Sequence, residues 1–199
     1  MHLRWQYFMD PRLEQHLFAD AYKAKVPFDP FARVRDYQAK CTTRDVVNRE
    51  AYLDTRFMMS DSVLMKADKM SMASALEIRV PLLDHRLVEY LGTVPGNQKL
   101  RGMTTKYIFR KALEGILPKE IVWRGKQGYS LPVKNLLRTQ LKDFMVALLH
   151  ESPLIREDFD VAFVDRLIEE HLSMKQNHNH VLWGLMNIAI WHRRFFRNG

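Results

Sequence analysis

A basic, glycine-containing stretch at residues 124–128, Arg-Gly-Lys-Gln-Gly, has the residue types that bind a phosphate group. Glycine has no Cβ, so the backbone at Gly125 and Gly128 can approach a ligand closely. Arg124 and Lys126 supply positive charge. A helix is expected to begin soon afterwards, at Pro132, and exposed amides at its start would attract an anion. The stretch therefore predicts a phosphate site, although a solvated basic turn has the same composition.

A second group of charged residues lies around Pro81. Residues 76–80 alternate apolar and charged side chains, and Pro81 disfavours a helical conformation at the residue before it, so we expect an extended segment. Glu77 and Arg79 then share one face of this segment. Asp84 stands where a helix cap is expected. The group predicts either a buried ion pair followed by a helix cap, or two charges presented to a cleft.

Other chemically reactive residues are isolated in the sequence. Cys41 is the only cysteine, and no local signature marks it as a nucleophile, so we expect a buried free thiol. His178 and His180 are two residues apart, which on a helix points them to different sides and argues against a metal site. Neither of the two common glycine-rich nucleotide-binding motifs occurs. The chain therefore lacks a complete nucleotide cradle.

Helical periodicity predicts a mainly α chain. We expect Thr43 to cap one helix and Thr104 or Thr105 to begin another, in which Lys106, Arg110 and Lys111 face outward. The last helix is expected to bury a stripe formed by Val181, Leu185, Ile188, His192 and Phe195. Residues 121–131 are expected to form a loop, and no cluster of strands is large enough for a sheet. The expected helices are 10–24, 29–41, 43–57, 61–75, 84–92, 104–115, 132–150, 159–174 and 180–197.

Composition indicates a globular protein. The chain has 199 residues, of which 47% are hydrophobic and 27% charged, and this excludes collagen-like, low-complexity and wholly disordered classes. No linker or repeat divides it, so we expect one unit. With one cysteine and no signal-peptide or membrane-spanning stretch, a cytoplasmic protein without a membrane partner is expected. The net charge of +8 suits an anionic partner such as a nucleotide or pyrophosphate.

Several blocks of the sequence resemble the synthetase domain of glutamine-hydrolysing asparagine synthetases. The first two are Ala67-Asp-Lys-Met-Ser-Met-Ala73 and Leu76-Glu-Ile-Arg-Val-Pro-Leu-Leu-Asp-His85. Further blocks follow in the family's order, and the best match covers 45–132 within a partial domain of 1–199. These further blocks are Pro95…Lys99, Lys106–Arg110, Leu117–Ile121 and Arg124–Pro132.

The resemblance implies a fold and a reaction. The fold would be the helical C-terminal portion of an adenine-nucleotide α-hydrolase-like α/β domain, of the PP-loop ATP pyrophosphatase type, whose sheet-forming part is absent from this chain. In the family, an aspartate carboxylate attacks the α-phosphate of ATP, pyrophosphate leaves, and ammonia from glutamine displaces AMP. ATP and Mg²⁺ are thus implied for the complete enzyme.

The resemblance also implies residue roles. Lys126 matches the catalytic lysine, which stabilises negative charge on the phosphates. We expect the residues beside it and one upstream lysine to bind the nucleotide or its phosphates, and the charged group around Pro81 to form the wall of the site or to be structural. The expected phosphate-binding residues are Arg124, Gly125, Gly128 and Lys106, and the wall residues are Glu77, Arg79 and Asp84.

Departures from the family pattern limit what this chain is expected to do alone. The family's pyrophosphate loop, Ser-Gly-Gly-x-Asp-Ser, does not occur, nor does the later acidic glycine-rich segment, so no metal ligands are assigned. A glutaminase domain begins with cysteine after its initiator methionine, whereas residue 2 here is His. We therefore expect a C-terminal fragment or one subunit of a split enzyme. It would be inactive alone and would need the N-terminal synthetase and glutaminase portion to use aspartate and glutamine.

Two alternatives remain at this point. A relative of the same fold could close a β-lactam or macrolactam ring through an acyl-adenylate, with a different carboxylate as acceptor. A weaker alternative is a basic helical nucleic-acid-binding module that uses the segment from Trp191 to Arg197. It would show binding that falls steeply with salt concentration.

Overall fold

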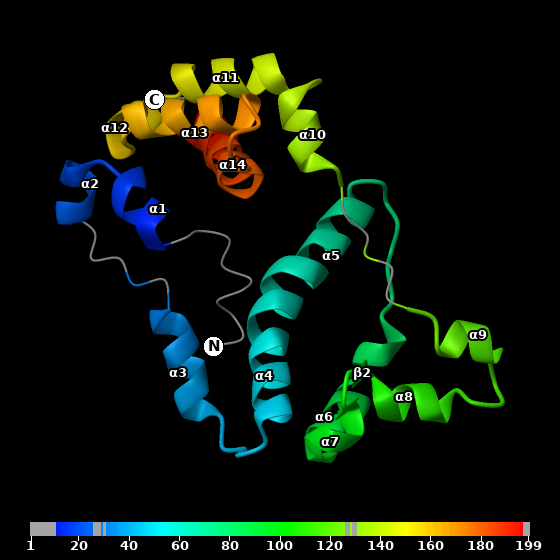
Figure 1. The fold of residues 1–199 in the computed structure, drawn as a ribbon. Helices are drawn as coiled ribbons and strands as arrows, with labels where there is room; N and C mark the ends of the chain where they lie inside the picture. The colour runs from blue at the N-terminus through cyan, green and yellow to red at the C-terminus, as the bar shows by residue number, and fades with distance from the viewer. Residues whose placement is uncertain (1–10, 26–28, 30, 126–127, 129–130, 197–199) are drawn as a thin grey trace. The chain divides into compact units, whose positions relative to one another are not determined.

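The computed structural model describes residues 11–25, 29, 31–125, 128 and 131–196. The chain divides into two compact units (Figure 1). Unit 1 combines residues 1–28 with 128–199, and unit 2 is residues 29–127. Helices dominate both units, and the described residues contain one sheet of two short strands. The prediction of a mainly helical chain is confirmed.

Unit 1 is a bundle of helices around an apolar core. Sixteen buried apolar side chains form one cluster, in which Leu137, Met145 and Leu182 are fully covered. Side-chain caps begin two of the helices: Ser152 accepts a hydrogen bond from the Ile155 amide, and Asp160 from the Phe163 amide. The helices are α1 (Pro11–Leu17), α2 (Asp20–Lys25), α10 (Val133–Arg138), α11 (Lys142–Glu151), α12 (Pro153–Asp158), α13 (Val161–Leu172) and α14 (Asn179–Phe195).

Tertiary contacts change the predicted helices of unit 1. The helix expected over 10–24 is interrupted at Phe18, which forms a β-bridge with Phe159. Backbone hydrogen bonds on both sides of this bridge replace those of a helix. The Asp160 amide donates to the Leu17 carbonyl at 2.9 Å, and the Ala19 amide donates to the Asp158 carbonyl at 3.0 Å. The helix expected over 132–150 is likewise two helices, α10 and α11.

The buried face of α14 includes only part of the predicted stripe. Val181 and Leu185 are buried, as predicted, whereas Ile188 is 39% and Phe195 66% exposed. Leu182, Met186 and Ala189 complete the buried face instead. The stripe was placed by spacing alone, and several neighbouring apolar residues fit the same helical period. Packing against the other helices of unit 1 selects one of these faces.

Unit 2 is built on a long helical rod. Figure 1 shows α4 (Val46–Asp54) and α5 (Met65–Met72) as parts of one continuous helix, with the π-helix η2 (Thr55–Leu64) between them. The strands β1 (Leu100–Arg101) and β2 (Thr104–Thr105) form an antiparallel pair. The other elements are α3 (Ala32–Lys40), the 3₁₀ helix η3 (Pro81–Leu83), α6 (His85–Thr93), α7 (Gly96–Lys99), α8 (Tyr107–Ala112) and α9 (Lys119–Val122).

Two separate helices were expected where the rod is continuous. Residues 58–60 contain neither glycine nor proline, so nothing in the sequence breaks the helix there. The hydroxyls of Thr55 and Ser60 donate to the carbonyls of Ala51 and Arg56, at 2.8 and 2.7 Å. Such bonds to the carbonyl four residues back compete with the α-helical pattern, consistent with the π-helical stretch.

The starts of two helices also differ from the predictions. Asp45, rather than Thr43, caps α4 by accepting the Asn48 amide at 3.1 Å. Thr104 and Thr105 form β2, and α8 begins only at Tyr107 because Lys106 adopts a left-handed backbone conformation, with φ of 57°. A left-handed residue cannot continue a right-handed helix on its N-terminal side.

Polar contacts join the ends of α4 and α7 in a cluster that we call the α4–α7 latch, formed by Asp45, Asn48, Gly96 and Lys99. Asp45 Oδ2 accepts the Gly96 amide at 2.7 Å, and Lys99 Nζ bonds to Asn48 Oδ1. Backbone amides of Asn48 and Gly96 hold the pKa of Asp45 below its ordinary value. Few apolar side chains are buried in unit 2 as a whole: among its described residues, the buried apolar ones are Leu53, Val94 and Val122.

Candidate nucleotide-binding site

The predicted phosphate-binding stretch follows directly from helix α9. This helix begins after Pro118, whose ring cannot donate a hydrogen bond and suits a helix start. It ends at Val122, and after Trp123 the residues Arg124 and Gly125 continue as an irregular, exposed backbone. Gly128 is also exposed, whereas Lys126 lies outside the described residues. The structure therefore gives the approach to the predicted catalytic lysine but not the lysine itself.

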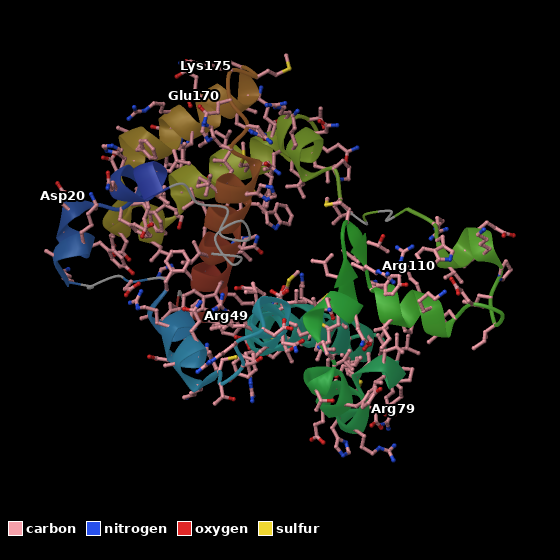
Figure 2. The ribbon with its side chains drawn as sticks, turned by 60° about the horizontal axis from the view of Figure 1, so that its bottom comes forward. Asp20, Arg49, Arg79, Arg110, Glu170 and Lys175 are labelled. Carbon is pink, nitrogen blue, oxygen red and sulfur yellow. The ribbon has the colours of Figure 1, made fainter. Side chains whose placement is uncertain are left out.

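The side chain of Arg110, on α8, contacts three consecutive residues at the end of α9. Its Nη1 donates to the Val122 carbonyl at 2.9 Å and, at 3.4 Å, to the Arg124 carbonyl. Trp123 lies between these two residues in the sequence, and the centroid of its ring is 5.6 Å from the guanidinium carbon of Arg110. Figure 2 shows Arg110 on α8. The helical spacing predicts Arg110 on the outward face, but Arg110 is half-buried, while the neighbouring Phe109 is 42% exposed.

Lys106, a second predicted phosphate-binding residue, is tied to Arg110 through the backbone. The Lys106 carbonyl accepts the Arg110 amide at 2.9 Å. Lys106 and Arg124 are both exposed, so both cations face solvent within unit 2. Arg110 thus contacts the backbone at two of the predicted phosphate-binding positions.

The charged group around Pro81 is non-helical but lies in a different environment from the predicted one. Residues 76–80 form neither a helix nor a strand, and Glu77 forms an ion pair with Arg79. The side chains are 66% and 86% exposed, so the expectation of a buried pair is wrong. Three apolar residues of the same segment are also exposed, namely Leu76, Ile78 and Val80. An exposed pair of this kind adds little stability because water screens it.

Asp84 is the helix cap that the sequence predicts. Its carboxylate begins α6 by accepting the Arg86 amide at 3.0 Å, and it also accepts a hydrogen bond from Arg86 Nε at 3.0 Å. The Arg86 side chain is the main cause that lowers the pKa of Asp84. Asp84 is therefore ionised at neutral pH and fixes the start of α6.

The structure does not join the two groups of predicted site residues. Within the described parts of the chain, no hydrogen bond or ion pair links Glu77, Arg79 or Asp84 to Lys106 or Arg124. Figure 2 shows Arg79 and Arg110 on different sides of unit 2. Two of the positions predicted to bind phosphate, Lys106 and Arg124, are connected through Arg110, whereas the predicted wall residues are not bonded to them.

No metal centre is present among the residues whose placement is described: no group of three or more His, Cys, Asp or Glu side chains could hold an ion there. These residues do not fit the Mg²⁺ that the resemblance implies. His178 bonds instead to Glu170, at 2.7 Å, and Cys41 is a free thiol that is half-buried rather than buried. Among the described helices, none has the length and apolar character needed to cross a membrane.

Comparison with known proteins places the chain in a family. The sequence profile of the family described as asparagine synthase matches residues 1–193. The chain belongs to this family. It is 31% identical to asparagine synthetase [glutamine-hydrolyzing] 1 of Bacillus subtilis over 172 residues, which cover 83% of this chain and 27% of that protein. No solved structure matches it.

Shorter alignments with other asparagine synthetases are also found. The chain is 47% identical to asparagine synthetase [glutamine-hydrolyzing] 3 of Bacillus subtilis over 78 residues, which cover 39% of this chain and 12% of that protein. It is 39% identical to the asparagine synthetase of Gallus gallus over 70 residues, which cover 34% of this chain and 12% of that protein. The chain spans about a quarter of the length of the curated relatives that match most of it.

Proposed function

We propose that this chain supplies the phosphate-binding helical part of an ATP-dependent asparagine synthetase, with Lys126 as the catalytic lysine. The observation that carries the proposal is the family match over residues 1–193, which includes the whole basic stretch from Arg124 to Gly128. The names of the relatives favour aspartate as the acceptor over the ring-closing alternative.

The proposed reaction has two steps. An oxygen of the aspartate side-chain carboxylate attacks the α-phosphorus of ATP, the bond to the bridging oxygen breaks, and pyrophosphate leaves. Ammonia released from glutamine then attacks the acyl carbon, the bond to the phosphate oxygen of AMP breaks, and the nitrogen loses a proton to give the amide. Negative charge increases on the phosphates in the first step, where a fixed cation lowers the barrier most.

The predicted phosphate-binding residues would contribute to this reaction in two ways, by their positive charge and by the close approach of their backbone. The cations of Lys106, Arg124 and Lys126 would bind the triphosphate, and Gly125 and Gly128 would let the backbone approach it. The exposure of Lys106 and Arg124 supports such a role, because both side chains can reach a ligand. We assign no step to Mg²⁺, since the described residues offer no ligand cluster for it.

Glu77, Arg79 and Asp84 are proposed to form a wall of the site. Asp84 fixes the start of α6, and the 3₁₀ helix η3 connects this cap to the segment 76–80, which carries the Glu77–Arg79 pair. The exposure of this pair leaves both charges able to contact a substrate. A structural role for the pair alone would contribute little, because exposed ion pairs add at most about 1 kcal/mol.

The chain alone is proposed not to form asparagine. Neither the family's pyrophosphate loop nor its acidic glycine-rich segment occurs in the 199 residues. Aspartate-dependent exchange of labelled pyrophosphate into ATP measures the first step without glutamine. We expect the chain alone to show no such exchange, and robust exchange would contradict this part of the proposal.

The role of Lys126 can be tested in a complete synthetase that contains this sequence. Lys126→Ala should reduce aspartate-dependent ATP–pyrophosphate exchange more than 100-fold, because removing a group that stabilises developing charge costs about 3 kcal/mol. Glutamine hydrolysis should continue. Lys119→Ala, which removes an exposed lysine from the start of α9, is the matched control and should leave exchange unchanged. Equal exchange in the Lys126→Ala variant and its parent would remove the assigned role.

A further inference from the structure

The contacts of Arg110 are directed at backbone rather than at an acid. Its guanidinium donates to the carbonyls of Val122 and Arg124 and lies over the ring of Trp123 between them. These carbonyls belong to the last turn of α9 and the residues that follow it, where a helix leaves carbonyl groups without intrahelical donors. Arg110 supplies those donors from a separate helix and so fixes the direction in which the chain leaves α9.

Arginine is suited to this task in a way that lysine is not. Its planar guanidinium carries five N–H donors in a rigid arrangement and can stack on an aromatic face while its edge donates hydrogen bonds. A lysine ammonium is a single point charge on a flexible stem. It could reach one of the two carbonyls, but it could not hold both and cover the Trp123 ring at the same time.

The same residue connects a second segment. The backbone amide of Arg110 donates to the carbonyl of Lys106, the residue with left-handed conformation that precedes α8. The backbone of Arg110 is thus bonded to Lys106, while its side chain is bonded to the segment that ends at Arg124. Displacement of this side chain would release the exit of α9 but leave the α8 hydrogen bond to Lys106 in place.

We propose that Arg110 is a positioning residue, which holds residues 122–124 so that Arg124 and Gly125 are presented to the nucleotide in one fixed orientation. This inference deepens the proposed function and rests on it for the identity of the ligand. Arg110 itself is half-buried against α9 and is not assigned any contact with substrate. Its effect on ATP would be indirect, through the backbone that it holds.

The first test needs no enzymatic activity and uses the chain itself. Hydrogen–deuterium exchange followed by mass spectrometry reports on the amides of Val122 and Trp123, which donate to the carbonyls of Pro118 and Lys119. Arg110→Ala should speed exchange in a peptide covering 119–125 about tenfold, the effect of losing roughly one net hydrogen bond. Exchange in α4 should stay unchanged. Unaltered exchange in 119–125 would overturn the inference.

Two matched variants separate positioning from charge and from folding. Lys111→Ala removes one positive charge from the adjacent position of α8, where the lysine pairs with the exposed Glu114, and should change nothing in 119–125. Arg110→Lys keeps the charge but not the two-carbonyl contact, so its exchange rate should lie between those of the parent and Arg110→Ala. An Arg110→Lys variant indistinguishable from the parent would show that charge alone matters and would overturn the inference.

The second test uses a complete synthetase that contains this sequence. Arg110→Ala should raise the KM for ATP in pyrophosphate exchange about tenfold, because the displaced segment loses phosphate contacts, and should leave the KM for aspartate unchanged. A merely structural loss would lower the amount of active enzyme and move neither KM. An unchanged KM for ATP would overturn the positioning role. If the parent shows no aspartate-dependent exchange, the proposed function fails, and the hydrogen-exchange test still decides whether Arg110 holds the segment.

Discussion

Replacement of Gly96 by alanine tests whether the α4–α7 latch holds unit 2 together. Gly96 begins α7, and its amide donates to Asp45 Oδ2 at 2.7 Å. A Cβ built at Gly96 would lie 2.7 Å from the Cβ of Val47 and would also overlap the Asp45 carboxylate. Real Cβ atoms do not approach this closely, and neither neighbour is the end of a long flexible side chain. Alanine at this position must therefore push α7 away from the start of α4.

Two free-energy costs set the size of the effect. Overpacking of a well-fitted contact costs about 1–3 kcal/mol. Loss of a hydrogen bond to a charged group, here the Asp45 carboxylate, costs about 1.5–3 kcal/mol. Movement of α7 relieves the first cost but increases the second, so the two are not fully additive. We expect Gly96→Ala to lower the free energy of unfolding by about 3 kcal/mol.

Urea unfolding of the full chain, followed by circular dichroism, measures this free energy, and hydrogen exchange in α4 shows that the loss is in unit 2. Gly92→Ala is the matched control: Gly92 lies within α6, and a Cβ there meets nothing within 4 Å. It should stabilise the chain by about 0.5–1 kcal/mol, because alanine favours a helix over glycine. If Gly96→Ala and Gly92→Ala change the stability alike, the packing argument for the latch is refuted.

Two further predictions concern stability. Burial lowers the pKa of His171, so the folded state holds it neutral while the unfolded state takes up a proton below about pH 6.5. The free energy of unfolding should therefore fall as the pH is lowered from 7.5 to 5, and His171→Gln should flatten this slope; an equal slope in the variant would contradict the assignment. Ala75 adopts a φ of 54°, which costs a non-glycine residue about 1–2 kcal/mol, so Ala75→Gly should stabilise the chain by about 0.5 kcal/mol after its entropic penalty. The control is Ala73→Gly, because Ala73 has a right-handed backbone conformation; this variant should destabilise the chain. If thermal melting shows a lower melting temperature for Ala75→Gly than for Ala73→Gly, the strain argument is refuted.

The features that the sequence predicts well depend on neighbouring residues. The end of the helical pattern before Pro81 is one of them, because alternation and the proline act within a few residues. The cap at Asp84 is another, since the carboxylate bonds to an amide two residues along the chain. The mainly helical character of the chain has the same local origin. Each of these depends on short-range sterics or hydrogen bonds that a linear pattern records.

The features that the sequence does not reveal depend on distant partners. The break at Phe18 is produced by a bridge to Phe159, at the other end of the chain. The role of Arg110 depends on backbone carbonyls, and every residue carries the same backbone carbonyl whatever its side chain. No residue type marks a backbone acceptor, so a pattern of side chains cannot indicate which arginine will find one. The signal that remained was weak: an arginine beside apolar residues on α8, with a tryptophan just before the basic stretch.

The two units of the chain are held in physically different ways, and this bears on where function can be lost. Unit 1 has a contiguous apolar core, in which a truncation costs stability in proportion to the area buried. The described part of unit 2 buries few apolar side chains, and directional bonds such as those of Asp45 and Arg110 orient its helices. A directional bond has a narrow range of geometries. When such a bond is lost, the helix that it holds changes orientation while the unit stays folded. Substitutions that remove the Arg110 contacts are therefore expected to change ligand affinity at a smaller cost in stability than core substitutions in unit 1.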